Sequence, residues 1–125
     1  MSRILIVEDN ELNLDMLSRR LALRGFEVLT AVTGERGLEI AEKEKPDIIL
    51  LDLRLPGIDG WEVLQRLKSN SDLEPIPVIA LTAHVFTNDR ERAFKAGFDE
   101  FAVKPVELPL LMQKMETLLA RRSVV

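Results

Sequence analysis

Residues 48–57 read IILLDLRLPG, a run of four large apolar residues that ends at an aspartate and is followed by a Pro-Gly pair. The run does not alternate with polar residues, which is typical of a strand covered on both faces, as in a parallel sheet. Similar short apolar runs lie at Ile4–Val7, Val28–Ala31, Val78–Leu81 and Phe101–Val103. Together with Ile48–Leu51, these runs predict five strands.

Segments of helical length and pattern separate the runs. The clearest is the last, whose apolar residues form one stripe: Leu108, Leu111, Met112, Met115, Leu118 and Leu119. We expect Asn10 to cap the first helix and Gly25 to end it, and we expect the second helix to end before Pro46. The order is therefore βα repeated five times, and right-handed crossovers then predict an α/β fold with a doubly wound parallel sheet.

Composition narrows the function further. The 125 residues suit one domain, and we expect it to span residues 1–122, with a short tail at 123–125. There is no cysteine and one histidine, which excludes disulfides, thiolate chemistry and Cys-based or multi-His metal sites. A net charge of −4 without a basic block argues against direct contact with nucleic acid. The apolar runs are too short to span a membrane and no signal-peptide pattern is present, so we expect a cytoplasmic protein.

Polar residues follow four of the five runs. Glu8 and Asp9 follow the first, Asp52 the third, Thr82 the fourth and Lys104 the fifth. Ligands of open α/β sheets bind at this carboxyl edge. Three clustered carboxylates repel one another unless a cation joins them, and oxygen ligands without His or Cys favour magnesium, with Asp9 and Asp52 as direct ligands. A carboxylate can attack phosphorus, so Asp52 is the candidate nucleophile, while Lys104 and Thr82 would offset the phosphoryl charge.

The chain resembles the receiver domain of two-component response regulators, of the single-domain type typical of chemotaxis regulators, over essentially its full length. The matching motifs are Val7-Glu8-Asp9-Asn10, DLRLPG at 52–57, Leu81-Thr82-Ala83, Lys104-Pro105 and Gly97 before the fifth strand. The resemblance implies a flavodoxin-like (βα)5 fold with strand order 2-1-3-4-5. It also implies a cis peptide bond at Lys104-Pro105.

The resemblance assigns a phosphoryl acceptor and a metal site. Asp52 would take phosphate from a histidine of a kinase or of a histidine phosphotransfer protein. Asp9 and Asp52 would bind Mg²⁺, Glu8 would act through a water molecule, and the main-chain carbonyl of Arg54 would complete the protein's ligands. Glu8 stands where many receivers have a second aspartate, and its longer side chain still reaches a metal-bound water.

The resemblance also assigns a switch. Thr82 would move toward the phosphoryl group and Phe101 would turn inward, which reshapes a face made of the fourth helix, fifth strand and fifth helix for a downstream protein. Arg54 and His84 would tune the phosphoryl lifetime, although His84 is equally well explained as an exposed residue at a helix start. Trp61 is either a partner contact or, as we favour, a partly buried aromatic at a helix start.

Three other interpretations share parts of this pattern. A flavodoxin-like electron carrier shares the fold, but the acidic loop at 8–10 would repel a flavin phosphate. A phosphatase with an aspartyl-phosphate intermediate needs a nearby general acid and a cap, and neither is present. A receiver that binds its partner without phosphorylation remains the main alternative. We expect a signalling protein, not an enzyme, and Met1 just before the first run favours a stand-alone regulator over a fragment.

Overall fold

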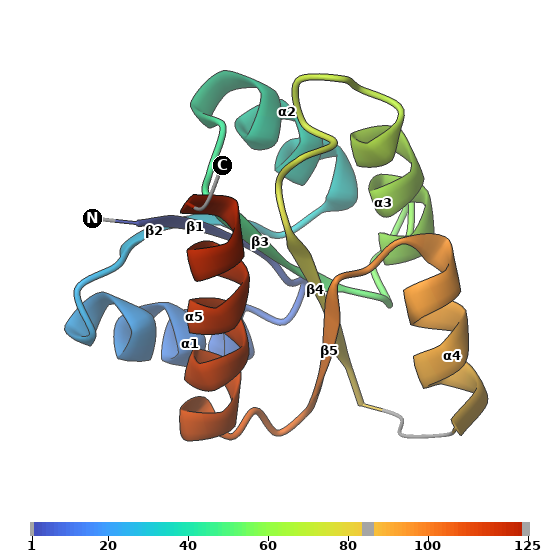
Figure 1. Ribbon diagram of the computed structural model, residues 1–125. Coiled ribbons are helices and arrows are strands. Elements are labelled where there is room, and N and C mark those ends of the chain that lie inside the picture. The colour runs from blue at the N-terminus through green and yellow to red at the C-terminus, as the bar shows by residue number, and fades with distance from the viewer. Residues whose placement is uncertain (1, 84–86, 124–125) are drawn as a thin grey trace.

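The computed structural model describes residues 2–83 and 87–123 of the chain. Within them, strands and helices alternate from one end to the other (Figure 1). The strands are β1 (Arg3–Val7), β2 (Glu27–Ala31), β3 (Ile48–Asp52), β4 (Val78–Thr82) and β5 (Glu100–Val103). The helices are α1 (Glu11–Leu23), α2 (Gly34–Glu44), α3 (Gly60–Lys68), α4 (Thr87–Ala96) and α5 (Leu108–Ser123).

The five strands form one parallel sheet in the order β2-β1-β3-β4-β5, which confirms the predicted fold class and strand order. Each strand includes one polar or charged residue beyond its apolar run, such as Asp52 at the end of β3 and Thr82 at the end of β4. These residues belong to the strands because main-chain pairing does not depend on the side chain: Asp52 lies opposite Leu81, and Thr82 lies opposite Val103. The carboxyl ends of the central strands therefore meet at one edge.

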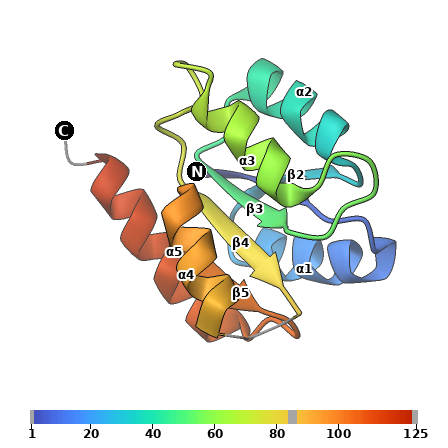
Figure 2. The same ribbon diagram turned by 90° about the vertical axis from the view of Figure 1, so that its right-hand side faces the viewer.

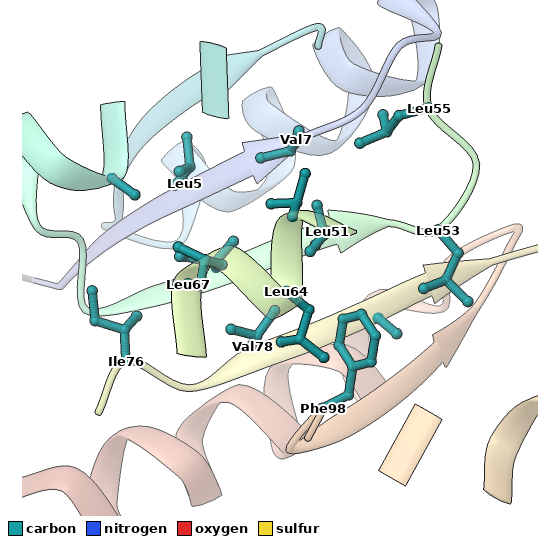
Figure 3. Packing of buried hydrophobic residues seen from close by; sticks show 14 of the residues in the cluster. Leu5, Val7, Leu51, Leu53, Leu55, Leu64, Leu67, Ile76, Val78 and Phe98 are labelled. Carbon is teal, nitrogen blue, oxygen red and sulfur yellow. The ribbon is translucent and has the colours of Figure 1, made fainter. Parts of the chain in front are cut away.

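Helices cover both faces of the sheet, as the two views show (Figures 1 and 2). On one face, α2, α3 and α4 pack on strand residues such as Leu5, Leu51 and Val78 (Figure 3). On the other face, α1 and α5 pack on the alternate residues, such as Ile6 and Leu50. Burial of both faces explains why the strand sequences are continuously apolar. Among the described residues, no helix is long and apolar enough to cross a membrane.

The predicted helix ends are also observed. Asn10 caps α1, its side chain accepting a hydrogen bond of 3.0 Å from the Asn13 N–H, and Thr33 caps α2 in the same way. Gly25 follows α1 with φ +94°, a conformation that glycine adopts without strain. Asp59 caps α3, which places the start of that helix directly after the loop that follows Asp52. Helix α2 ends at Glu44, before Pro46.

Candidate functional site

The polar residues that follow the strands come together at the carboxyl edge of the sheet. Glu8 follows β1, Asp52 ends β3, Thr82 ends β4 and Lys104 follows β5. Glu8, Asp52 and Thr82 are the buried polar or charged residues among those described, with 2%, 5% and 5% exposure. Such groups are rarely buried without partners, so their placement side by side singles out this edge.

Lys104 joins the two buried carboxylates. Its Nζ lies 2.7 Å from Oδ2 of Asp52 and 2.7 Å from Oε1 of Glu8. The peptide bond between Lys104 and Pro105 is cis, as the family resemblance implied. The direct contact between Glu8 and Lys104 was not predicted, because sequence analysis assigned Glu8 only a role through water. Charge-assisted bonds of this length are among the stronger hydrogen bonds in proteins.

The main chain fixes Asp52 in place. The Arg54 N–H donates to Oδ1 of Asp52 at 2.9 Å, while Oδ2 faces Lys104. The first residue of α3, Gly60, donates its N–H to the Leu53 carbonyl at 3.1 Å. A Cβ atom at Gly60 would lie 2.3 Å from the Asp52 carbonyl oxygen and 2.7 Å from Leu53 Cα. Only glycine allows α3 to begin this close to Asp52, a role that sequence analysis missed.

These surroundings shift the acidities of the three groups. Burial is the largest effect on Glu8, and together with the adjacent Asp52 it raises the pKa of Glu8 from 4.5 to about 7 against the opposing effect of Lys104. Burial acts on Asp52 too, but the neighbouring Glu8 carboxyl and the hydrogen bonds from Lys104 and the Arg54 N–H outweigh it and hold the Asp52 pKa below its ordinary value. Burial opposes the charge on Lys104, yet the two carboxylates raise its pKa. Asp52 is therefore ionised at neutral pH.

Three carboxylates are arranged as a cation site would require. Glu8, Asp9 and Asp52 each offer one oxygen, and these atoms lie within 4.8 Å of one another. Oε2 of Glu8 is buried and has no hydrogen-bond partner, which is costly unless a further positive group or a bound water satisfies it. Asp9 is exposed, so the site opens to solvent on its side. An all-oxygen ligand set of this kind fits Mg²⁺.

The remaining predicted residues lie around this centre. Phe101 is buried, with 4% exposure, in the cluster on the α4 face of the sheet. The side chain of Arg54 is exposed, while its main chain contacts Asp52. Trp61 is partly buried at the start of α3, as favoured from sequence. His84 lies outside the described residues.

Two further features near the site had no clear signal in the sequence. The Asn13 side chain in α1 donates from Nδ2 to Oε1 of Glu8 at 3.4 Å, a long bond that still orients the carboxylate. A cavity of about 180 Å³ lies between α1 and the segment after β5, lined by Glu8 and Lys104 on its polar side and by Met16 and Val106 among its apolar residues. The helical pattern of the sequence places Asn13 on α1, but only the packing of α1 beside the end of β1 brings its side chain to Glu8.

Comparison with known proteins agrees with this geometry. Residues 4–116 match the model of the response regulator receiver domain family. The polar-differentiation response regulator DivK of Brucella anthropi is 35% identical over 116 residues, which cover 93% of this chain and 94% of DivK.

Solved structures show the same similarity. The receiver domain of the sensor histidine kinase PA1611 of Pseudomonas aeruginosa, solved with a magnesium ion coordinated in its active site cleft, superposes with a TM-score of 0.88 at 30% identity. The match covers 95% of this chain and 98% of that domain. The chemotaxis response regulator CheY4 of Vibrio cholerae superposes with a TM-score of 0.88 at 26% identity, covering 94% of this chain and 98% of CheY4.

Proposed function

Because the chain belongs to the response regulator receiver domain family of two-component signalling, we propose that it is a switch that accepts a phosphoryl group on Asp52. The donor is a phosphohistidine of a histidine kinase or of a histidine phosphotransfer protein. A carboxylate oxygen of Asp52 attacks the phosphorus atom, the bond from phosphorus to the histidine nitrogen breaks, and the nitrogen keeps the electron pair. Receiver domains are signalling modules, and the product here is a signal, so the protein is not classed as an enzyme.

The observation that supports this proposal most strongly is the contact of 2.7 Å between Lys104 Nζ and Oδ2 of Asp52. It holds a cation next to the oxygen that would carry the phosphoryl group, where the charge of the incoming oxygens increases. The lowered pKa of Asp52 keeps the attacking group ionised. Thr82, buried beside Asp52 at the end of β4, offers a hydroxyl to the same group.

Asp9 and Asp52 would hold Mg²⁺ directly, Glu8 would act through water, and the carbonyl of Arg54 would complete the ligand set. The cluster of carboxylate oxygens and the unpartnered Oε2 of Glu8 support this assignment. Magnesium supplies positive charge that offsets the oxygens of the phosphoryl group. The chain's own contribution is to fix the two aspartates at adjacent strand ends and to balance their charge with Lys104.

Phosphorylation would reach a partner through Thr82 and Phe101. The two residues lie on neighbouring strands, two residues apart in register, since Ala80 pairs with Phe101 and Thr82 with Val103. A shift of Thr82 toward the phosphoryl group would change the packing of Phe101 and the face made of α4, β5 and α5, which would bind the downstream protein. Arg54 and His84 would tune phosphoryl lifetime.

A cytoplasmic location and a domain over residues 1–122 stay predictions.

The deciding experiment is intact-protein mass spectrometry after incubation with Mg²⁺ and acetyl phosphate. We expect one phosphate's added mass in the wild type and none in Asp52→Asn. Asp72→Asn, at an exposed position in the loop before β4, is the matched control and should be modified like the wild type. An unmodified wild type that also fails to bind beryllofluoride would leave the alternative, a receiver-like module that binds its partner without phosphorylation.

A further inference from the structure

Helix α3 begins so close to the main chain of Asp52 that its first position, Gly60, has no room for a side chain. Gly60 contacts the Asp52 carbonyl and Leu53 Cα so tightly that a Cβ atom would overlap both. Its N–H also bonds to the Leu53 carbonyl. A displacement of the Asp52 main chain therefore moves the first turn of α3, because close-packed atoms transmit strain.

The next residue, Trp61, connects α3 to the fourth helix. The Cζ atom of Arg92 lies 4.2 Å from the centre of the indole ring, within the range of a cation–π contact. The edge of Phe98, which follows α4, meets the same ring with centres 5.6 Å apart and planes at 79°. Helices α3 and α4 lie on the same face of the sheet (Figure 2).

The described side chains of helix α4 bury little apolar surface. Of its residues 90–96, whose side chains the structure describes, Ala93 is the one that is buried. Phe94 is 41% exposed, although it is a large apolar residue. By contrast, α3 buries Val63, Leu64 and Leu67. Because the described part of α4 buries less apolar surface than α3, it moves at lower cost, and the stacking of Arg92 on Trp61 is one of the contacts that hold it.

We infer that Trp61 couples the main chain at Asp52 to helix α4 through Arg92, as a positioning residue of the switch. This rests on the proposed function, since it describes how modification of Asp52 reaches α4. It adds a connection through α3 to the one through Thr82 and Phe101. The stacking of Arg92 on Trp61 breaks or changes when α4 shifts. By thermodynamic linkage, this stacking then also changes the affinity of the site for a phosphoryl group.

The test uses the fluorescence of Trp61, which is the sole tryptophan in a chain without tyrosine. Beryllofluoride with Mg²⁺ is titrated into the wild type, Arg92→Ala and the control Arg90→Ala, and calorimetry measures binding separately. Arg90 is a matched control because it lies on the same helix with its guanidinium 5.8 Å from the Phe94 ring centre, away from Trp61. Arg92→Gln, which keeps most of the side-chain length, replaces Arg92→Ala should that variant not fold.

We expect beryllofluoride to change the emission of the wild type and of Arg90→Ala, and Arg92→Ala to lose more than half of this change. Its apparent affinity for beryllofluoride should differ from wild type about two- to fivefold, the range that one exposed cation–π contact supports. Arg92→Lys should restore part of the response. Beryllofluoride binding without an emission change, or an Arg92→Ala variant that matches wild type in both readouts, would overturn the coupling. No binding to the wild type at all would instead overturn the proposed function, and the coupling with it.

Discussion

Replacing Glu8 with glutamine should raise the free energy of unfolding at alkaline pH. At acidic pH the same substitution should have little effect. Glu8 is 2% exposed and its pKa is raised from 4.5 to about 7, so the folded chain holds a proton that the unfolded chain releases. Below pH 4.5 both states are protonated and Glu8 has no such effect. Between 4.5 and 7 the folded state binds more protons, so stability falls as pH rises. Above pH 7 the whole penalty is present, about 3 kcal/mol at about 1.4 kcal/mol for each pKa unit.

The same linkage gives the size of the effect between two practical conditions. The penalty is about 1 kcal/mol at pH 5 and about 3 kcal/mol at pH 8, so the stability gained in Glu8→Gln should be about 2 kcal/mol larger at pH 8. Urea unfolding in EDTA at both pH values measures this difference, and Glu116→Gln, at an exposed position in α5, is the control. A Glu8→Gln effect that is equal at pH 5 and pH 8 would refute the reasoning.

Three further variants test other parts of the structure. Asn10→Ala removes the cap of α1 and should cost about 1 kcal/mol in urea unfolding, and no loss would mean that the cap is replaced by water. Gly60→Ala should cost at least about 1–3 kcal/mol and weaken Mg²⁺ binding measured by calorimetry, because its Cβ would displace the Asp52 main chain; wild-type affinity would contradict the packing. Lys104→Met should lower beryllofluoride affinity about 10- to 100-fold, the range expected for a hydrogen bond to a charged group, and a change under twofold would exclude Lys104 from the site.

Most of the fold could be predicted because the apolar pattern is simple. Strands buried on both faces need continuous apolar runs, and the five runs correspond to the five observed strands within one residue at each end. The missing end residues, such as Glu27 and Glu100, are charged or polar, so hydrophobicity could not identify them. Main-chain pairing with Arg3 and Ile79 places them in the sheet.

The candidate site could be predicted as a set of residues, but not as a set of contacts. The polar residues after each run identified Glu8, Asp52 and Lys104, because parallel strands bring their carboxyl ends together. The sequence could not show that Lys104 contacts both acids, since that depends on side-chain reach across three strands. The stacking of Arg92 on Trp61 was equally hidden, because it depends on how two helices pack.

The burial of Glu8 is itself an argument for the proposed site. Its carboxylate is placed where ionisation is unfavourable, beside Asp52, and one of its oxygens has no hydrogen-bond partner. The apolar core on both faces of the sheet supplies the stability that offsets this arrangement. Local conflicts of this kind are expected at functional sites, where a residue serves chemistry at the expense of stability. A divalent cation would remove the conflict, since it favours the ionised form of Glu8 and of both aspartates, so Mg²⁺ should stabilise the wild type more at pH 8 than it stabilises Glu8→Gln.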